Sequence, residues 1–301
     1  MSSKFVNEKI IDGSKIALAI REEVSKSVEE MVYKHSMKPG LAVILVGDDP
    51  ASAVYVRNKE RSAIEVGMKS ETFRLSSDTT EEEVVELIQT LNANDKYHGI
   101  LVQLPLPDHI NENHVISKIS YMKDVDGLHP INAGLLSAGN PRFIPATPAG
   151  IKEMLLRTDN NPSGKHVVVL GRSNIVGRPV SNHLSMKGDG GTATVTVCHS
   201  RSSDLVNFTR SADIIIAALG IPNYLGADMI SEGVVIIDVG INRVEAPERK
   251  RGYRLVGDVN FGEVLQKSSA ITPVPGGVGP LTIAMLLSNT VQAARIFNHG
   301  D

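Results

Sequence analysis

The sequence predicts an α/β protein of two domains, each with a parallel sheet covered by helices. Two observations lead to this fold class. Short apolar runs rich in valine and isoleucine recur along the chain, as buried parallel strands do, and helical patterns can separate them. A stretch with several prolines and glycines, residues 104–148, interrupts this series, so we place a domain boundary near Thr147. The 301 residues, 42% of them hydrophobic, suffice for two cores.

The first domain is expected to comprise residues 1–147 and, after the second domain, residues 281–301. Its elements alternate between helix and strand, which is typical of a parallel sheet. Asp49-Pro50 favours a helix start, because aspartate caps free N–H groups and proline suits the first turn. We predict helices at 12–36, 50–67 and 79–91, strands at 41–46, 70–75 and 99–102, and a rigid loop at 103–107.

The second domain, residues 148–280, is expected to be Rossmann-like, with a cleft between it and the first domain. Its apolar runs are spaced so that a helix can connect each strand to the next. We predict strands at 166–170, 192–197, 214–218 and 234–238, a helix at 148–157, and a charged surface loop at 245–253. A helix at 281–296 then returns the chain to the first domain.

Composition excludes several classes of partner. The formal net charge is −3, no long basic block occurs and aromatic residues make up 4%, so nucleic acid is not expected as a ligand. No apolar run approaches the length of a membrane span. The lone Cys198 excludes an intrachain disulfide and, with an N-terminus that lacks a signal-peptide pattern, favours the cytoplasm. We predict no metal site.

A tyrosine and a lysine follow the strand at 41–46. Tyr55 and Lys59 are four residues apart, so they share one side of the predicted helix. Ligands of open α/β sheets bind beyond the carboxyl ends of the strands, which makes this pair a candidate for substrate contact. The alternative is a solvated helix face, because residues 57–61 are all polar.

The strand at 166–170 ends in a glycine-containing turn. Gly171 to Gly177 reads G-x-S-x-x-x-G, which departs from the regular dinucleotide fingerprint G-x-G-x-x-G. A tight turn before a helix still directs free N–H groups at an anion, and Arg172 and Ser173 add donors for phosphate. An ordinary strand–helix turn is the alternative.

The next strand indicates which nucleotide would bind. NAD sites usually hold the ribose with an acid at the end of this strand. Here the strand is followed by Ser200 and Arg201, with no carboxylate until Asp204. Ser200, Arg201 and Arg172 suit a 2′-phosphate, so we predict NADP. Cys198, at the strand end, is expected to be a small buried hydrophobe.

Several motifs together resemble one family in order over nearly the whole chain. These motifs are Tyr55-Val56-Arg57-Asn58-Lys59, Val102-Gln103-Leu104-Pro105-Leu106-Pro107, Lys123-Asp124-Val125-Asp126-Gly127, Gly171-Arg172-Ser173, Val176-Gly177-Arg178-Pro179, Cys198-His199-Ser200, Asp238-Val239-Gly240-Ile241-Asn242, Gly257-Asp258-Val259 and the segment 272–280. In them the sequence is similar to the bifunctional methylenetetrahydrofolate dehydrogenase/methenyltetrahydrofolate cyclohydrolases.

The resemblance implies two reactions in one-carbon folate metabolism, which serves purine biosynthesis. An oxidoreductase step would pass hydride from 5,10-methylenetetrahydrofolate to NADP. A hydrolase step would then open the methenyl product to 10-formyltetrahydrofolate. The family commonly forms homodimers. Hydride transfer depends mainly on orientation, whereas ring opening needs a group that moves protons.

The resemblance also assigns roles. Lys59 matches the catalytic lysine and Gln103 the residue that positions it. Tyr55 would lie along the folate ring, and Asp126, otherwise an ordinary turn aspartate, would accept hydrogen bonds from the pterin. The remaining folate contacts that it implies are Val102, Leu104, Pro275, Gly276, Gly277, Val278 and Gly279, and Ile241 would touch the nicotinamide.

Two other functions stay open. A monofunctional dehydrogenase would lack cyclohydrolase activity, although the retained Lys59 and Gln103 disfavour it. A non-catalytic protein would bind folate or nucleotide without turnover. Short-chain dehydrogenases also use Tyr-x-x-x-Lys, but there the pair follows the nucleotide turn, whereas here it precedes it.

Overall fold

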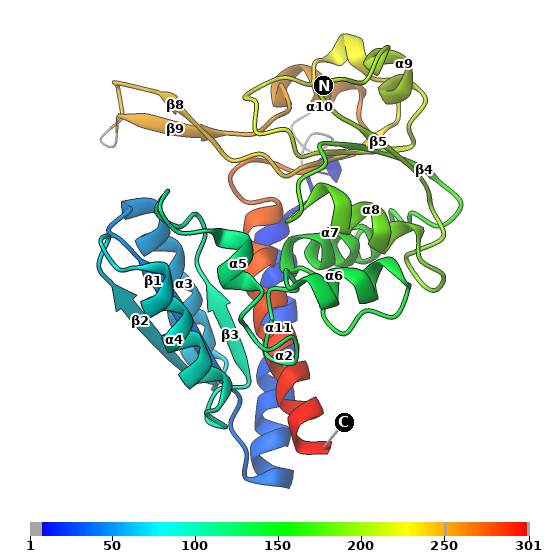
Figure 1. Ribbon diagram of the computed structural model, residues 1–301. Helices are drawn as coiled ribbons and strands as arrows, with labels where there is room; N and C mark the ends of the chain where they lie inside the picture. The colour runs from blue at the N-terminus through cyan, green and yellow to red at the C-terminus, as the bar shows by residue number, and fades with distance from the viewer. Residues whose placement is uncertain (1–7, 250–251, 300–301) are drawn as a thin grey trace. The chain divides into compact units, whose positions relative to one another are not determined.

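The computed structural model describes residues 8–249 and 252–299, and the chain divides into two compact units. The three-stranded unit comprises residues 18–146 and 283–299. The five-stranded unit comprises residues 8–17 and 147–282. Both sheets are parallel and covered by helices, which confirms the predicted fold class (Figure 1).

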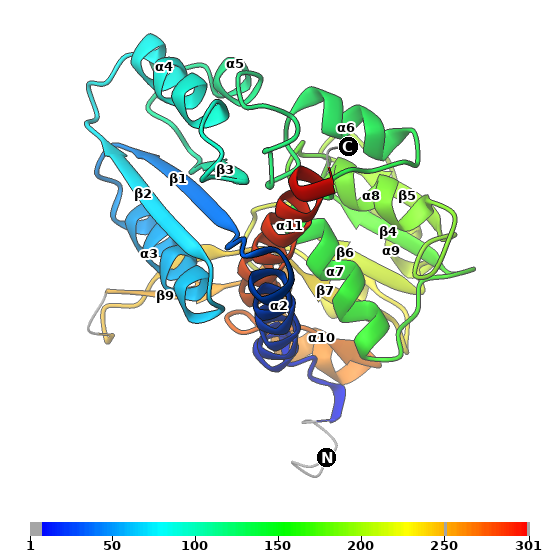
Figure 2. The same cartoon turned by 90° about the horizontal axis from the view of Figure 1, so that it is seen from below.

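The three-stranded unit has the strand order β2-β1-β3. Its strands are β1 (Gly40–Val46), β2 (Lys69–Leu75) and β3 (Gly99–Val102). Helix α3 (Pro50–Glu65) covers one face, and α4 (Glu81–Asn92) and α5 (Glu112–Ile116) cover the other (Figure 2). Side chains alternate along a strand, so the even-numbered residues of β1 and β3 pack under α4.

Further helices complete this unit. Helix α6 spans Pro130–Ser137, and most of α2 (Gly13–His35) and α11 (Val278–His299) also belongs to it. The side chain of Asn298 on α11 contacts that of His35 on α2. Among the described residues, no helix is long and apolar enough to cross a membrane.

The five-stranded unit has the strand order β10-β7-β6-β4-β5. The strands are β4 (His166–Leu170), β5 (Thr194–Cys198), β6 (Ile214–Ala217), β7 (Val235–Asp238) and β10 (Ala270–Ile271). Helices α7 (Ala146–Arg157) and α8 (Gly177–Ser185) cover one face, and α9 (Leu205–Arg210), α10 (Phe261–Lys267) and the 3₁₀ helix η1 (Ala227–Met229) lie on the other (Figure 1). Strand β4 has β5 on one side and β6 on the other, so the chain reverses its direction across the sheet at β4. This reversal creates a topological switch point.

Two features differ from the sequence prediction. The charged segment 245–253 was expected to be a loop, but its ends lie in an antiparallel hairpin of β8 (Asn242–Glu245) and β9 (Tyr253–Val256). These strands are half exposed and lack the apolar run that marks a buried strand. Residues 8–17, placed by sequence in the first domain, group with the five-stranded unit because the Ile11 N–H donates to the Ile271 oxygen at 2.9 Å.

Candidate active site

Lys59 lies on the buried face of α3. The side chain of Asp49 caps this helix by accepting a hydrogen bond from the Ser52 N–H, as Asp49-Pro50 predicts. Lys59 follows Ser52 and Val56 on the same buried face and is only 9% exposed. The structure therefore excludes the solvated helix face as an explanation of Lys59. Burial lowers the pKa of Lys59 below its ordinary 10.5, and the charge of Asp126 partly opposes this shift.

Gln103 holds the Lys59 amine. Its backbone N–H continues the sheet by donating to the Ile44 oxygen at 2.9 Å. The Lys59 Nζ donates to the Gln103 Oε1 at 3.0 Å, and the Gln103 Nε2 donates to the Leu104 oxygen at 2.7 Å. Because the amide nitrogen is bound to a carbonyl, the amide oxygen faces the amine. Gln103 thus orients Lys59, as the resemblance implies.

Asp126 belongs to a segment that runs beside β3. The Ile100 N–H donates to the Lys123 oxygen at 2.8 Å, and Ile100 forms a parallel bridge with Asp124. This register brings Asp126 to the carboxyl end of β3, where Gln103 begins its loop. Burial raises the pKa of Asp126 above its ordinary 3.8, and the positive charge of Lys59 opposes the rise. Asp126 and Lys59 therefore form an electrostatically coupled pair.

The neighbours of Asp126 hold this segment in place. The Asp124 carboxylate accepts hydrogen bonds from the N–H groups of Leu128 and His129 and from the Asn132 side chain. The Lys123 Nζ donates to the oxygens of Leu91 and Asn94. Lys123 and Asp124 are thus structural residues of the motif. The sequence motif alone did not indicate these two roles.

Asn289 is a second support that sequence analysis missed. This α11 residue is buried, and its Nδ2 donates to the Val125 oxygen at 2.8 Å and to the Ile144 oxygen at 2.9 Å. Its position, about 160 residues after Val125 in the chain, left no local signal. Asn289 fixes the backbone directly before Asp126.

The other folate contacts predicted in this unit differ in exposure. Tyr55 is 42% exposed and lies one helical turn before Lys59, so its ring is free to meet a ligand. Val102 is buried in the core beneath α4, and Leu104 packs against the same core. Both side chains therefore pack in the core, so we expect these two residues to contact a folate through their backbone.

The glycine segment 275–279 lies in the five-stranded unit. Gly276 has φ +104°, and a Cβ on Gly277 would lie 2.5 Å from the Pro273 oxygen, so neither position accommodates a side chain easily. Pro275 is exposed and Val278 is buried. A Cβ on Gly279 would lie 3.8 Å from the Ile241 Cδ1, so the structure places the predicted nicotinamide contact beside the glycine segment.

The turn after β4 is closely packed at the switch point. Gly171 has φ +116°, and a Cβ there would lie 2.1 Å from the Ala218 oxygen. A Cβ on Gly177 would lie 2.3 Å from the Gly171 oxygen, which lets α8 begin directly against the turn. The Ser173 Oγ accepts hydrogen bonds from the N–H groups of Val176 and Gly177. Ser173 is therefore a cap of the turn as well as a candidate phosphate contact.

The loops after β4 and β5 leave the sheet at the same edge. Leu170 pairs with Cys198, and the Gly171 N–H donates to the Cys198 oxygen at 2.8 Å. Arg172, Ser200 and Arg201 are exposed at this edge. His199 had no role predicted from sequence. Its Nδ1 accepts a hydrogen bond from the Arg201 backbone N–H, and its backbone N–H donates to the Ser202 Oγ. These bonds shape the loop that carries both candidate 2′-phosphate contacts.

These residues fit a nucleotide with a 2′-phosphate. The crowded Gly171 turn brings backbone close to the start of α8, where a pyrophosphate is favoured. The exposed arginines and serine supply donors that have no carboxylate beside them at the strand end. Gly171, Arg172, Ser173, Ser200 and Arg201 would hold NADP, with Ile241 toward its nicotinamide.

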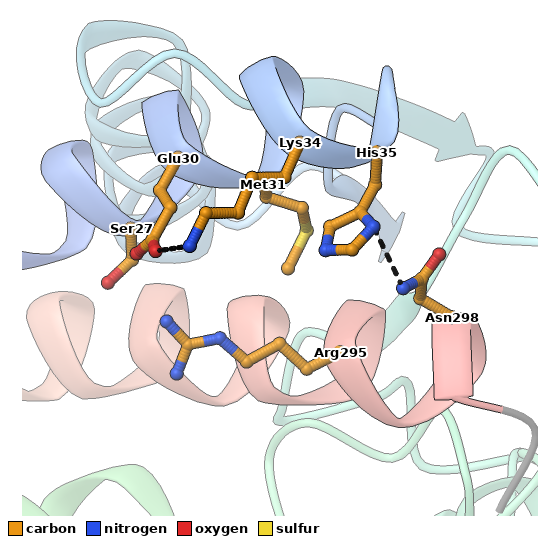
Figure 3. Close-up of a pocket in the computed structure, with 7 residues that line it drawn as sticks. All are labelled: Ser27, Glu30, Met31, Lys34, His35, Arg295 and Asn298. Carbon is orange, nitrogen blue, oxygen red and sulfur yellow. Dashed lines mark hydrogen bonds and ion pairs between the residues drawn. The ribbon is translucent and has the colours of Figure 1, made fainter.

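The described parts of the chain also contain a surface pocket away from the predicted site residues. A surface pocket of about 210 Å³ lies between α2 and α11 and is lined by Ser27, Glu30, Met31, Lys34, His35, Arg295 and Asn298 (Figure 3). Lys34 is paired with Glu30, and none of these seven residues is a predicted site residue. Across residues 8–249 and 252–299, no cluster of three or more His, Cys, Asp or Glu side chains could hold a metal ion.

Two family models match the chain. Residues 11–126 match the tetrahydrofolate dehydrogenase/cyclohydrolase catalytic domain. Residues 145–298 match the NAD(P)-binding domain of the same family. The two matches cover both units in sequence order.

Curated relatives and solved structures agree with the family models. The chain is 52% identical over 287 residues to the bifunctional protein FolD of Salinibacter ruber, covering 95% of this chain and 96% of the relative. It is 53% identical over 292 residues to that of Chlorobium phaeobacteroides, covering 96% and 98%. The Campylobacter jejuni FolD structure, a methylenetetrahydrofolate dehydrogenase/cyclohydrolase, superposes with a TM-score of 0.88 at 48% identity and 95% and 98% coverage.

A further structure contains the cofactor. The Trypanosoma brucei methylenetetrahydrofolate dehydrogenase-cyclohydrolase, complexed with NADP and an inhibitor, superposes with a TM-score of 0.90 at 38% identity, covering 96% of this chain and 98% of that one. Because these sequence identities cover almost the whole length of the chain, they include both units. The chain therefore belongs to the tetrahydrofolate dehydrogenase/cyclohydrolase family.

Proposed function

We propose that this protein oxidises 5,10-methylenetetrahydrofolate with NADP and hydrolyses the resulting 5,10-methenyltetrahydrofolate to 10-formyltetrahydrofolate. The observation that carries the proposal is the buried Lys59 amine, bound to Gln103 and coupled in charge to Asp126. Membership of the family supports both reactions, since the curated relatives are named as bifunctional.

In the dehydrogenase step, the residues bind and orient the folate. Asp126 would accept hydrogen bonds from the pterin amino and ring N–H groups through two carboxylate oxygens. Tyr55 would lie along the folate ring and limit its rotation. When bound, NADP would supply the hydride acceptor. Hydride transfer needs a fixed approach more than proton transfer, so Lys59 is not essential to this step.

In the cyclohydrolase step, Lys59 moves protons. Water oxygen forms a bond to the methenyl carbon, and the neutral Lys59 amine accepts one proton from that water. The bond from this carbon to N5 then breaks, N5 receives a proton from Lys59, and the hydroxyl proton passes to solvent. The carbon remains on N10 as a formyl group. The lowered pKa of Lys59 increases the fraction of neutral amine available as a base.

An assay of both steps tests the function. Purified protein should produce NADPH from 5,10-methylenetetrahydrofolate, and it should also accelerate hydrolysis of methenyltetrahydrofolate added without cofactor. NADPH formation without enzyme-dependent hydrolysis would identify a monofunctional dehydrogenase. Binding of both ligands without either reaction would identify a non-catalytic protein. The cleft predicted between the domains stays a prediction.

We expect the exposed arginines to determine the choice of cofactor. Arg172→Ala and Arg201→Ala should each reduce the kcat/KM ratio for NADP over NAD by about tenfold, because each removes a charged contact to the 2′-phosphate. The matched control is Arg178→Ala, since Arg178 is also exposed and lies at the start of α8, directly after the turn. The assay compares initial rates with the two cofactors. An unchanged ratio in both variants would refute the assignment.

We also infer that the protein is a cytoplasmic homodimer. The family resemblance supports the dimer, and β2 is the edge strand of its sheet in the described chain, with an outer edge available to a second copy. Light scattering after size exclusion should give the mass of two chains at micromolar concentration, and the mass of one chain would contradict the dimer. Cell fractionation tests the location, which the lone buried Cys198 favours.

A further inference from the structure

Two buried aspartates in the five-stranded unit have no part in the chemistry above. Asp238 ends β7 and is 3% exposed, and Asp258 follows β9 and is 0% exposed. Burying carboxylates is costly unless several donors surround them. Their partners therefore indicate what these residues do.

Asp258 binds two separate segments of the chain. Its Oδ2 accepts hydrogen bonds from the N–H groups of Leu219 at 2.6 Å and Gly220 at 2.9 Å, in the loop after β6. Its Oδ1 accepts a hydrogen bond from the Asn242 Nδ2 at 2.9 Å. Asn242 begins β8, directly after the loop that follows β7. One carboxylate thus ties together two loops at the carboxyl edge of the sheet.

Asp238 holds Asp258 in place. Its carboxylate accepts hydrogen bonds from the N–H groups of Gly240, Asp258 and Val259 at 2.9–3.0 Å. The packing leaves no room for a side chain, since a Cβ on Gly240 would lie 2.2 Å from the Asp258 Oδ1 and one on Gly257 would lie 1.8 Å from the Asp238 Oδ2. The backbone at Gly240 and Gly257 therefore packs directly against the two carboxylates.

The two segments bound by Asp258 lie at opposite ends of the expected nucleotide. The Leu219 segment continues from Ala218, whose oxygen packs against the phosphate turn at Gly171. The Asn242 segment continues from Ile241, which is 46% exposed beside Gly279. Asp258 therefore fixes the position of Ile241 relative to the phosphate turn.

We propose that Asp258 is a positioning residue of the dehydrogenase, which acts through Asn242 to hold Ile241 at the nicotinamide end of the cofactor site. This inference rests on the proposed NADP site. Asp258 touches neither folate nor cofactor in this proposal. Loss of Asp258 should consequently lower the rate of hydride transfer. It should leave the rate of ring opening unchanged, because ring opening takes no cofactor.

Asn242→Ala is the more selective test, because it removes the link to Ile241 and leaves the bonds from Leu219 and Gly220 to Asp258 intact. Asp258→Asn replaces one of the two acceptor oxygens with an N–H₂ group and so breaks the bonds on one side of the carboxylate. Asn242→Ala keeps the proposal testable if that variant does not fold. The control is Thr209→Val. Thr209, like Asp258, is 0% exposed and lies in the same unit, and its hydroxyl donates to the Met229 oxygen without contact to these loops.

Three measurements separate positioning from general stability. They are the kcat for NADPH formation, the rate of methenyltetrahydrofolate hydrolysis without cofactor, and the calorimetric Kd for 2′-phospho-ADP-ribose, which lacks the nicotinamide. For Asn242→Ala we expect the kcat of NADPH formation to fall about tenfold, the effect of losing one hydrogen bond to a charged group. Hydrolysis and the Kd for 2′-phospho-ADP-ribose should stay within about twofold, as in Thr209→Val.

A parallel loss of hydrolysis and of 2′-phospho-ADP-ribose affinity would overturn the proposal and make Asp258 a purely structural residue. An NADPH-forming kcat within twofold of wild type in Asn242→Ala would overturn it as well. If the wild type itself forms no NADPH, the proposed function fails instead. The two failures are therefore distinct.

Discussion

Replacing Lys59 with methionine should lower cyclohydrolase activity by about 10³-fold, because ring opening loses the group that accepts and returns a proton. The dehydrogenase activity should stay within about tenfold of wild type, since hydride transfer depends on orientation. Methionine has similar length and apolar character, so the buried face of α3 keeps its packing. The two activities are measured separately, by hydrolysis of methenyltetrahydrofolate and by NADPH formation.

The stability of Lys59→Met separates this effect from misfolding. Removing a buried amine removes its desolvation cost, so the free energy of unfolding at pH 7 should be unchanged or higher. The pKa of Lys59 is lowered in the folded state, so the unfolded chain binds more protons between the lowered value and 10.5. The stability of the wild type should therefore rise with pH across that window, and the variant should lack this rise.

Lys59→Arg is the matched control for charge. Arginine keeps the positive charge and a hydrogen bond to Gln103 but does not lose its proton near neutral pH. It should therefore be as inactive in ring opening as methionine. Normal ring opening in either variant would show that Lys59 does not transfer the proton.

The fold was largely predictable because parallel strands leave a strong sequence signal. Runs such as 41–46 and 167–170 are buried on both faces and are therefore apolar throughout. The β8–β9 hairpin was missed because it is exposed and follows no such pattern. Glu245 and Tyr253, the two ends of the predicted charged loop, pair as the last residue of β8 and the first of β9, so the missed elements are the strands that flank this loop.

A residue of the candidate site was predictable only where the sequence around it carries a signal of its own. Lys59 carries a detectable signal, since it falls at helical spacing with the apolar Val56 and Ala63 on one face of α3. Asn289 and Asp258 carry none. Each binds backbone groups brought near by the tertiary fold, and backbone groups have the same chemistry in every residue.

Asp126→Asn should weaken folate binding in both reactions. The carboxylate offers acceptors on both oxygens, whereas an asparagine amide turns an N–H₂ group toward the N–H donors of the pterin. Loss of two charge-assisted hydrogen bonds should raise the folate KM about a hundredfold or more in each assay. The calorimetric Kd for NADP should not change, because NADP is expected on the five-stranded unit.

The pH dependence of KM tests the same contact. Burial raises the pKa of Asp126, so as pH falls through that value the carboxyl group gains a proton and loses acceptor capacity. The wild-type folate KM should therefore rise on acidification, while that of Asp126→Asn should stay flat. Asp124→Asn is the control for the segment, because it replaces one of the two oxygens that accept from Leu128 and His129 with an N–H₂ group and should lower the free energy of unfolding. If Asp126→Asn changed only one of the two activities, Asp126 would act on a reaction step and not in the binding of the substrate that both steps share.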